Sequence, residues 1–330
     1  MMTPRRAVTA ILLPFLVGCA LGRGEDWLSP VGKRHPLAGH IWDVNAARLL
    51  DSSQLIRRLA APSLVLLGEK HDNADHHRLQ ARIVEGLVAA GRRPAVAFEM
   101  LSVDLDPLLT NTLARPSVTS DEVREAIRWD ESGWPEWNLY APVFEAALRA
   151  HLPIAAADLS RFSIDSIRRE GLGALDPELV AHLGLDTPLS REQRRALTDQ
   201  IREAHCGHAP RHLIGRMVDV QRARDAHMAR KLIDASRLSP TGSAVLIAGI
   251  EHVRRDWGGL LHLSRWAPEA DIASVGFIEV IEGQTAPAET LTERYGESVP
   301  LDYVWFTPRV DDIDPCEKFK EHLQKMRERL

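Results

Sequence analysis

The sequence predicts an α/β fold: a mostly parallel sheet flanked by helices, with an inserted helical subdomain. Short continuous apolar runs, typical of strands buried on both faces of a parallel sheet, alternate with segments of helical spacing. Two of the runs, Leu64–Leu67 and Ala244–Ala248, are each followed by a Gly-x-x-His sequence. Because ligands bind at the carboxyl ends of strands in open α/β sheets, we expect the site between these two strand ends.

The start of the chain is expected to be a targeting segment and a tether. Arg5 and Arg6 precede the apolar run Ala7–Val17, which is too short to span a bilayer. Leu16–Cys19 resembles a bacterial lipobox, in which Cys19 becomes the lipidated first residue; an ordinary signal peptide with an incidental cysteine is the alternative. We therefore expect a signal peptide over residues 1–18, a tether over 19–36 and one domain over 37–330.

The composition fits a globular domain. The 330 residues are 45% hydrophobic and 26% charged, which is enough for a sizeable core. The formal net charge of −5 argues against a nucleic-acid partner, because such proteins usually present a basic face.

The first half of the domain is expected to alternate strands and helices around a βαβ unit. Asp72 or Asn73 would cap its helix and Gly91 would end it, while Ser52 or Ser53 would cap the helix before the first core strand. Pro116 would break the last segment into two helices. In chain order the segments are Leu37–Asp43 (strand or hairpin), Leu55–Leu59 (helix), Leu64–Leu67 (strand), Leu79–Val88 (helix), Pro94–Phe98 (strand) and Ser102–Arg128 (helical).

The second half is expected to hold the helical insert, at about residues 160–236. An aromatic loop, Trp129 to Tyr140, leads into a helix from Asn138. On the long helix of the insert, Gln221 and Asp225 fall at the edge of the apolar stripe, where they would need buried partners. The segments are Pro153–Ala157 (strand), Ile164–His208 (interrupted helices), His212–Ser236 (helix), Ala244–Ala248 (strand), Gly258–Trp266 (helix), Ile272–Ile281 and Leu301–Phe306 (strands) and Pro315–Leu330 (helix).

Polar side chains follow four of the expected strands. They are Glu69 and His71, Glu99, Asp158 with Arg161, and Glu251 with His252. If the strands are parallel neighbours, these groups share one crevice, where they could bind a metal or carry out acid–base chemistry with Arg161 stabilising an anion. Any one of them taken alone is more often a solvated loop residue.

Aromatic and histidine-rich segments give further candidates. Trp134 and Trp137 could form a flat apolar wall beside Tyr140, and a phenolate is a good ligand for ferric haem iron; a packed aromatic at a helix start is the alternative. His205, Cys206 and His208 are interpreted as a helix-end cluster. A disulfide between Cys206 and Cys316 is one possibility in an oxidising compartment, and His76 and His77 are expected to face solvent.

Several of these motifs together resemble the ChaN family of haem-binding lipoproteins, within the Tiki/TraB/erythromycin-esterase-like superfamily. The resemblance extends from Pro36 to about Phe306. The motifs are Gly68–Asn73, Asp75–Gln80, Phe98–Met100, Ser132–Tyr140, Gln221–Asp225, His227–Ala229 and Ala248–His252.

The resemblance implies a lipid-anchored protein of the bacterial outer membrane that faces the periplasm and takes part in haem or iron uptake or storage. It implies a homodimer with stacked haems, each ligated by a tyrosine and assisted by a partner histidine, and an outer-membrane receptor is a possible partner. The matching tyrosine is Tyr140, with Trp134 and Trp137 as the wall. The candidate assisting histidines are His205, His208 and His212.

The same superfamily implies an alternative function. Tiki-like members are metal-dependent proteases that use two Gly-x-x-His motifs and a glutamate. His71, Glu99 and His252 match that pattern as ligands of a divalent metal, with Glu69 and Arg161 completing a hydrolytic site. A partner-binding lipoprotein with a vestigial site is the third possibility.

Overall fold

A single eight-stranded sheet organises the chain, and the computed structural model describes residues 26–328. The strand order is β2-β1-β8-β7-β3-β6-β4-β5; all pairs from β8 to β5 are parallel, and β1 and β2 form an antiparallel edge. The expected mostly parallel α/β fold is thus confirmed. Cys19 and the expected signal peptide over residues 1–18 lie outside the described residues. No helix among residues 26–328 is long and apolar enough to cross a membrane.

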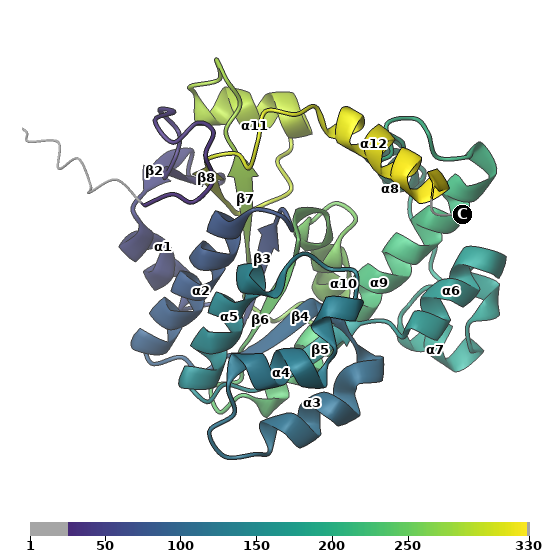
Figure 1. Ribbon diagram of the computed structural model, residues 1–330, viewed down its shortest axis with the longest axis horizontal. Coiled ribbons are helices and arrows are strands. Elements are labelled where there is room, and N and C mark those ends of the chain that lie inside the picture. Colours follow the sequence, from purple (N-terminus) through teal and green to yellow (C-terminus); the bar gives the residue numbers. More distant parts are fainter. Residues whose placement is uncertain (1–25, 329–330) are drawn as a thin grey trace, which may run out of the picture.

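The strands alternate with helices along the chain (Figure 1). The strands are β1 (Ile41–Asp43), β2 (Arg48–Leu50), β3 (Leu64–Glu69), β4 (Ala95–Ser102), β5 (Ile154–Asp158), β6 (Ala244–Gly249), β7 (Ile272–Glu279) and β8 (Tyr303–Thr307). The helices are α1 (Ser52–Leu59), α2 (Ala74–Ala89), α3 (Asp106–Leu113), α4 (Ser120–Ala126), α5 (Trp137–Arg149), α6 (Arg161–Glu170), α7 (Pro177–His182), α8 (Arg191–Ala204), α9 (Arg211–Leu238), α10 (Gly259–Trp266), α11 (Pro287–Tyr295) and α12 (Pro315–Glu328).

Local capping explains where the first helices begin. Asn73 caps α2, and its side chain accepts from the backbone N–H groups of Asp75 and His76. The cap of α1 is Asp51, which forms a capping box with Gln54, so the expectation of Ser52 or Ser53 as the cap is wrong. A carboxylate one residue earlier satisfies the same N–H groups, and both serines then fall inside the helix.

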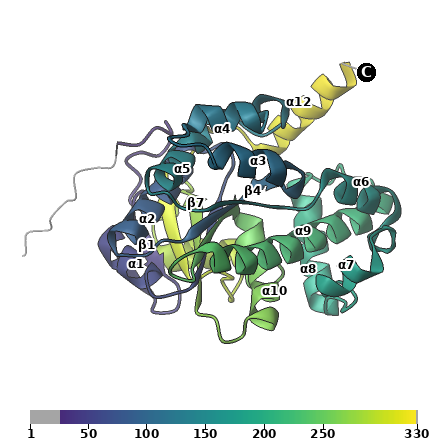
Figure 2. The same cartoon turned by 90° about the horizontal axis from the view of Figure 1, so that it is seen from below.

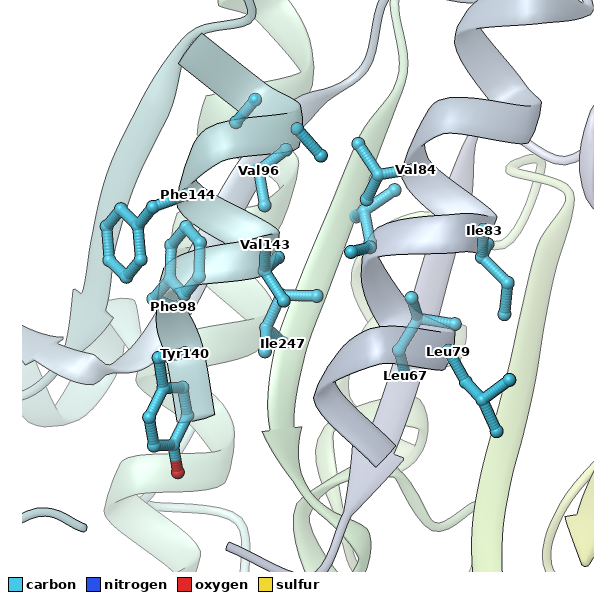
Figure 3. Packing of buried hydrophobic residues seen from close by; sticks show 14 of the residues in the cluster. Leu67, Leu79, Ile83, Val84, Val96, Phe98, Tyr140, Val143, Phe144 and Ile247 are labelled. Atoms are coloured by element: carbon cyan, nitrogen blue, oxygen red, sulfur yellow. The ribbon is translucent and has the colours of Figure 1, made fainter. Parts of the chain in front are cut away.

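Alternate side chains of the strands build two cores on opposite faces of the sheet. One face carries Val65, Leu67, Val96, Phe98 and Ile247, packed against α2 and α5. Figure 3 shows the last four of these beside Ile83 of α2 and Val143 of α5. The other face packs against α9 and α10, which lie across the strands from α4 and α5 (Figure 2). With both faces covered, the carboxyl ends of the strands remain as the place where polar groups can gather.

In the sequence, the helices α6 to α9 come between β5 and β6. The C-terminal helix α12 lies near α8 in the structure (Figure 1). Their side chains form two smaller apolar clusters beside α9. A disulfide between Cys206 and Cys316 joins the end of the α8 region to the start of α12. The pairing left open by the sequence is therefore made, across 110 residues of chain.

Candidate functional site

The two Gly-x-x-His motifs lie side by side at the end of the sheet. In the parallel pairing of β3 with β6, Gly68 is opposite Ala248 and Glu69 is opposite Gly249. Strand β4 lies on the other side of β6 and brings Glu99 to the same edge. The register of three neighbouring strands therefore brings residues about 180 positions apart into one cluster, as the sequence pattern predicts.

Each glycine of these motifs makes room for the other motif. A Cβ at Gly68 would lie 2.3 Å from Val253 Cγ2 and 2.9 Å from Ile250 Cα. A Cβ at Gly249 would lie 2.9 Å from Nε2 of His71. The physical role of both glycines is close approach between the two strand exits, rather than backbone flexibility.

The first polar cluster is centred on Glu69. The hydroxyl of Tyr140 donates to Glu69 Oε1 over 2.9 Å, and His71 Nδ1 is 2.9 Å from the same oxygen. Nδ1 of His77 is 3.0 Å from Oε2, while its Nε2 donates to the backbone carbonyl of His71. Burial alone would raise the pKa of Glu69, but the imidazoles of His77 and His71 lower it to about 2. Glu69 is therefore ionised at neutral pH.

His76 and His77 are fully buried, so the expectation that they face solvent is wrong. Nδ1 of His76 accepts from the Lys70 backbone N–H, and its Nε2 is 2.8 Å from Thr307 Oγ1. The cap at Asn73 turns the first turn of α2 so that both imidazoles face the sheet end. Burial, with His77 beside it, holds the pKa of His76 well below its usual range, so His76 is neutral.

Tyr140 is buried with its oxygen directed away from the labelled apolar side chains (Figure 3). Besides Glu69, its hydroxyl lies 3.2 Å from Nδ1 of His71, whose ring is partly exposed. Burial and the neighbouring carboxylate of Glu69 raise the pKa of Tyr140 far above its ordinary value. In this conformation the phenol is protonated and acts as a hydrogen-bond donor.

The second polar cluster is an ion network around Arg224. Nη2 of Arg224 is 2.8 Å from Glu99 Oε1, and Nε is 2.8 Å from Asp158 Oδ1. His252 bridges Glu99, 3.1 Å from its Nε2, and Asp225, 2.5 Å from its Nδ1. Burial alone would lower the pKa of His252, but Glu99 and Asp225 raise it to about 10. Asp225 thus has the buried partner that its place on the helix stripe required.

Arg224 falls within the Gln221–Asp225 motif, but sequence reasoning gave it no role, because α9 carries six arginines and the sequence does not show which of them reaches a buried carboxylate. The structure shows what it does: its guanidinium occupies the space between the carboxylates of Glu99 and Asp158. Among residues 26–328, no group of three or more His, Cys, Asp or Glu side chains could hold a metal ion. Of the proposed metal ligands, Glu99 and His252 are paired with each other and with Arg224 and Asp225, and His71 is paired with Glu69.

A cleft of about 740 Å³ opens next to these clusters. Its apolar lining is Met100, Leu105, Ile127, Trp134, Leu159, Ile164 and Val220, and its cationic lining is Arg128, Arg161, Arg168 and Arg224. The Trp134 ring stands edge-on to the His71 ring at 5.0 Å between centroids and so links the cleft to the first cluster. The expectation that Trp137 forms part of the same wall is wrong, because it is buried in the core against Trp129 and Phe144.

The remaining candidates lie elsewhere. His205 and His208 line a separate cavity in the helical insert, and His212 is exposed in the first turn of α9. Glu251 pairs with Arg254 beside the second motif and lines a third cavity of about 300 Å³ together with Glu69, His71 and His252. Arg161 is at the rim of the main cleft and is exposed.

Comparison with known proteins identifies relatives of the chain. A family model described as "Haem-binding uptake, Tiki superfamily, ChaN" matches residues 55–263, more than half of the chain. The structure titled "Cofacial heme binding to ChaN of Campylobacter jejuni" is similar with a TM-score of 0.62 and 23% identity, covering 80% of this chain and 95% of that one. No curated protein matches the sequence.

Two further solved structures are more distant. They are the type III effector HopBA1, with a TM-score of 0.43, 14% identity and coverage of 77% of this chain and 92% of that one, and a mutant of the erythromycin esterase EreC in its open conformation, with a TM-score of 0.44, 14% identity and coverage of 78% and 95%.

Proposed function

The chain belongs to the ChaN family of haem-binding uptake proteins in the Tiki superfamily, and we propose that it binds haem in the cleft beside Trp134. The family match carries the proposal, because residues 55–263 include every residue that lines the cleft. The volume of about 740 Å³ is in the range of pockets for ligands of this size.

The lining of the cleft suits the chemistry of haem. Its apolar side chains, with Trp134 among them, can cover a flat porphyrin face. Guanidinium groups pair well with carboxylates, and three of them, Arg128, Arg161 and Arg168, line the cleft. Arg128 and Arg168 form exposed pairs with Glu131 and Asp165, which a propionate would have to replace, whereas Arg161 contacts the backbone carbonyl of Ser132.

We propose Tyr140 as the iron ligand, as the family resemblance implies. Ligation requires the phenolate, whereas the haem-free phenol is protonated, buried and bonded to Glu69. His71 lies against the phenol oxygen and Trp134 lies against His71, so both rings have to move aside. We therefore expect haem binding to release a proton and to become tighter as the pH rises.

A titration with haemin tests this proposal. Purified protein should give a saturable Soret shift, and Tyr140→Phe should change the spectrum of the complex. Tyr295→Phe is the matched control, because Tyr295 packs against Arg254 and belongs neither to the cleft lining nor to the Glu69 cluster that holds Tyr140. A shift that Tyr140→Phe leaves unchanged would remove tyrosine ligation, and the absence of any shift would remove haem binding.

We also propose lipidation at Cys19, a periplasm-facing place at the outer membrane, a role in haem or iron uptake or storage, and a dimer of the haem complex. The lipobox supports the anchor, and the disulfide suits an oxidising compartment. Cys19→Ala should move the protein from the membrane fraction to the soluble fraction. The mass of the complex, measured alongside the titration, tests the dimer.

A hydrolytic role remains the second candidate function. It is favoured by the cavity of about 300 Å³, where His71 and His252 meet buried carboxylates. Turnover of a peptide or ester that disappears in His71→Ala and Glu99→Ala would support it. Turnover unaffected by both substitutions would exclude this site as its origin.

A further inference from the structure

A second cavity, of about 490 Å³, lies in the helical insert. Its apolar lining is Ile201, Ala209, Pro210, Leu213, Met217, Val220 and Phe319, and its polar lining is Arg168, His205, His208, Arg216 and Gln221. Val220 and Arg168 also line the main cleft, so the two cavities are neighbours along α9. An apolar cavity with a few imidazole and guanidinium groups is suited to a flat, apolar anion.

A hydrogen bond orients the ring of His205. It is the C-cap residue of α8, and its Nδ1 lies 2.7 Å from the carbonyl oxygen of Ile201, to which it donates. Because Nδ1 carries the hydrogen of this bond, Nε2 is the nitrogen that a neutral imidazole would offer to a metal. His205 is partly buried at the cavity wall, where such a nitrogen is available to a ligand.

The C-terminal helix completes the cavity. Phe319 of α12 packs edge-on against His205, at 5.7 Å between ring centroids, and stacks on His208 at 6.3 Å. The disulfide from Cys206 to Cys316 attaches α12 next to His205 and holds Phe319 in the wall. The cavity is therefore a built site, with a fixed imidazole on one side and a tethered aromatic side chain on the other.

We propose that this cavity is a second haem site within one chain, with His205 as the iron ligand. The inference rests on the proposed function, because it takes haem as the ligand of the protein. Arg168, which lines both cavities, is placed to pair with a propionate from either side. The two sites would differ in ligand chemistry, since the first uses a phenolate oxygen and the second an imidazole nitrogen.

The test combines haemin stoichiometry with resonance Raman spectra of the dithionite-reduced complex. Wild type should bind two haems per chain and show an iron–imidazole stretching band. His205→Ala should lose the band and one haem, whereas His182→Ala, at the exposed end of α7, should keep both. Changes in the second shell of a metal site alone typically cost 10–100-fold in affinity, so loss of the ligand should weaken this site at least about tenfold.

A second variant protects the test from a folding defect. The double substitution Cys206→Ser and Cys316→Ser leaves His205 in place and releases α12; it should weaken the band-forming site and leave the Tyr140-dependent spectrum unchanged. One haem per chain with no iron–imidazole band, or a band that survives His205→Ala, would overturn the inference and leave the proposed function standing. A band that is lost in His205→Ala, without any signal that depends on Tyr140 or on the cleft, would support the second site and contradict haem binding in the main cleft. No haem at all would remove both.

Discussion

Replacing Arg224 with Met tests whether one guanidinium holds the buried carboxylates together. Methionine keeps the apolar stem but removes the guanidinium that pairs with Glu99, 1% exposed, and Asp158, 10% exposed. Breaking a buried ion pair by removing one partner typically costs about 3–5 kcal/mol. Glu99 keeps His252 and the Gly249 N–H as partners, so we expect the lower end of that range, about 3 kcal/mol.

The assay is chemical denaturation followed by far-UV circular dichroism. The free energies of unfolding are compared between variants that show the same dependence on denaturant concentration. Arg237→Met is the matched control, because Arg237 forms an exposed pair with Asp234 on the same helix and should cost less than about 1 kcal/mol. The cost of Arg224→Met should shrink as the pH is lowered, since loss of the guanidinium raises the pKa of Glu99 and protonation removes its buried charge. Equal costs for the two variants would refute this account of the network.

Three further predictions follow from the same geometry. Gly68→Ala should cost about 1–3 kcal/mol of folding free energy by overpacking, whereas Gly173→Ala, with open space around the new Cβ, should be near neutral in the same denaturation assay. The pKa of His252 is raised from 6.5 to about 10. Its contribution to the free energy of unfolding is therefore complete below pH 6.5 and is lost as the pH rises toward 10, by up to about 1.4 kcal/mol per pH unit. The free energy of unfolding of His252→Gln should lack this dependence on pH. Reduction of the Cys206–Cys316 disulfide should speed proteolytic cleavage ahead of α12, and an unchanged cleavage pattern would show that the bond does not restrain that helix.

The sequence predicts the sheet well because each buried strand carries its own local signal. Apolar runs that each follow a Pro or Gly within two residues mark β3, β4, β5 and β6, and the carboxyl ends of neighbouring parallel strands lie at the same edge of the sheet. Helix α11 is not among the expected elements, because Thr290 and Leu291 alone are a buried face too short to show a period.

The site is predicted less completely because side-chain placement depends on packing between distant segments. His76 and His77 look like solvated first-turn residues until the Asn73 cap fixes the turn. Trp137 and Trp134 share one motif, yet the start of α5 directs one into the core and leaves the other at the cleft. Arg224 stands in the Gln221–Asp225 motif, but its partners, Glu99 and Asp158, come from two distant strands that the motif does not indicate.

Buried charge at the strand ends is balanced in two separate ways. Glu69 is surrounded by imidazoles and a phenol, while Glu99 is balanced by a guanidinium and an imidazolium. In the second arrangement each carboxylate has a cationic partner, so we expect these side chains to stay in place when a ligand binds. The first contains the partly exposed His71 and the Trp134 contact, so rearrangement on ligand binding is expected on that side.

The central claim is that the cleft beside Trp134 holds haem, and equilibrium titration with haemin tests it most directly. The account predicts a saturable Soret shift in the wild type that is weakened by charge reversal at the rim, as in Arg161→Glu, and kept in Arg237→Glu on the far part of α9. A Soret spectrum identical to that of free haemin, or binding that both arginine variants leave intact, would contradict it.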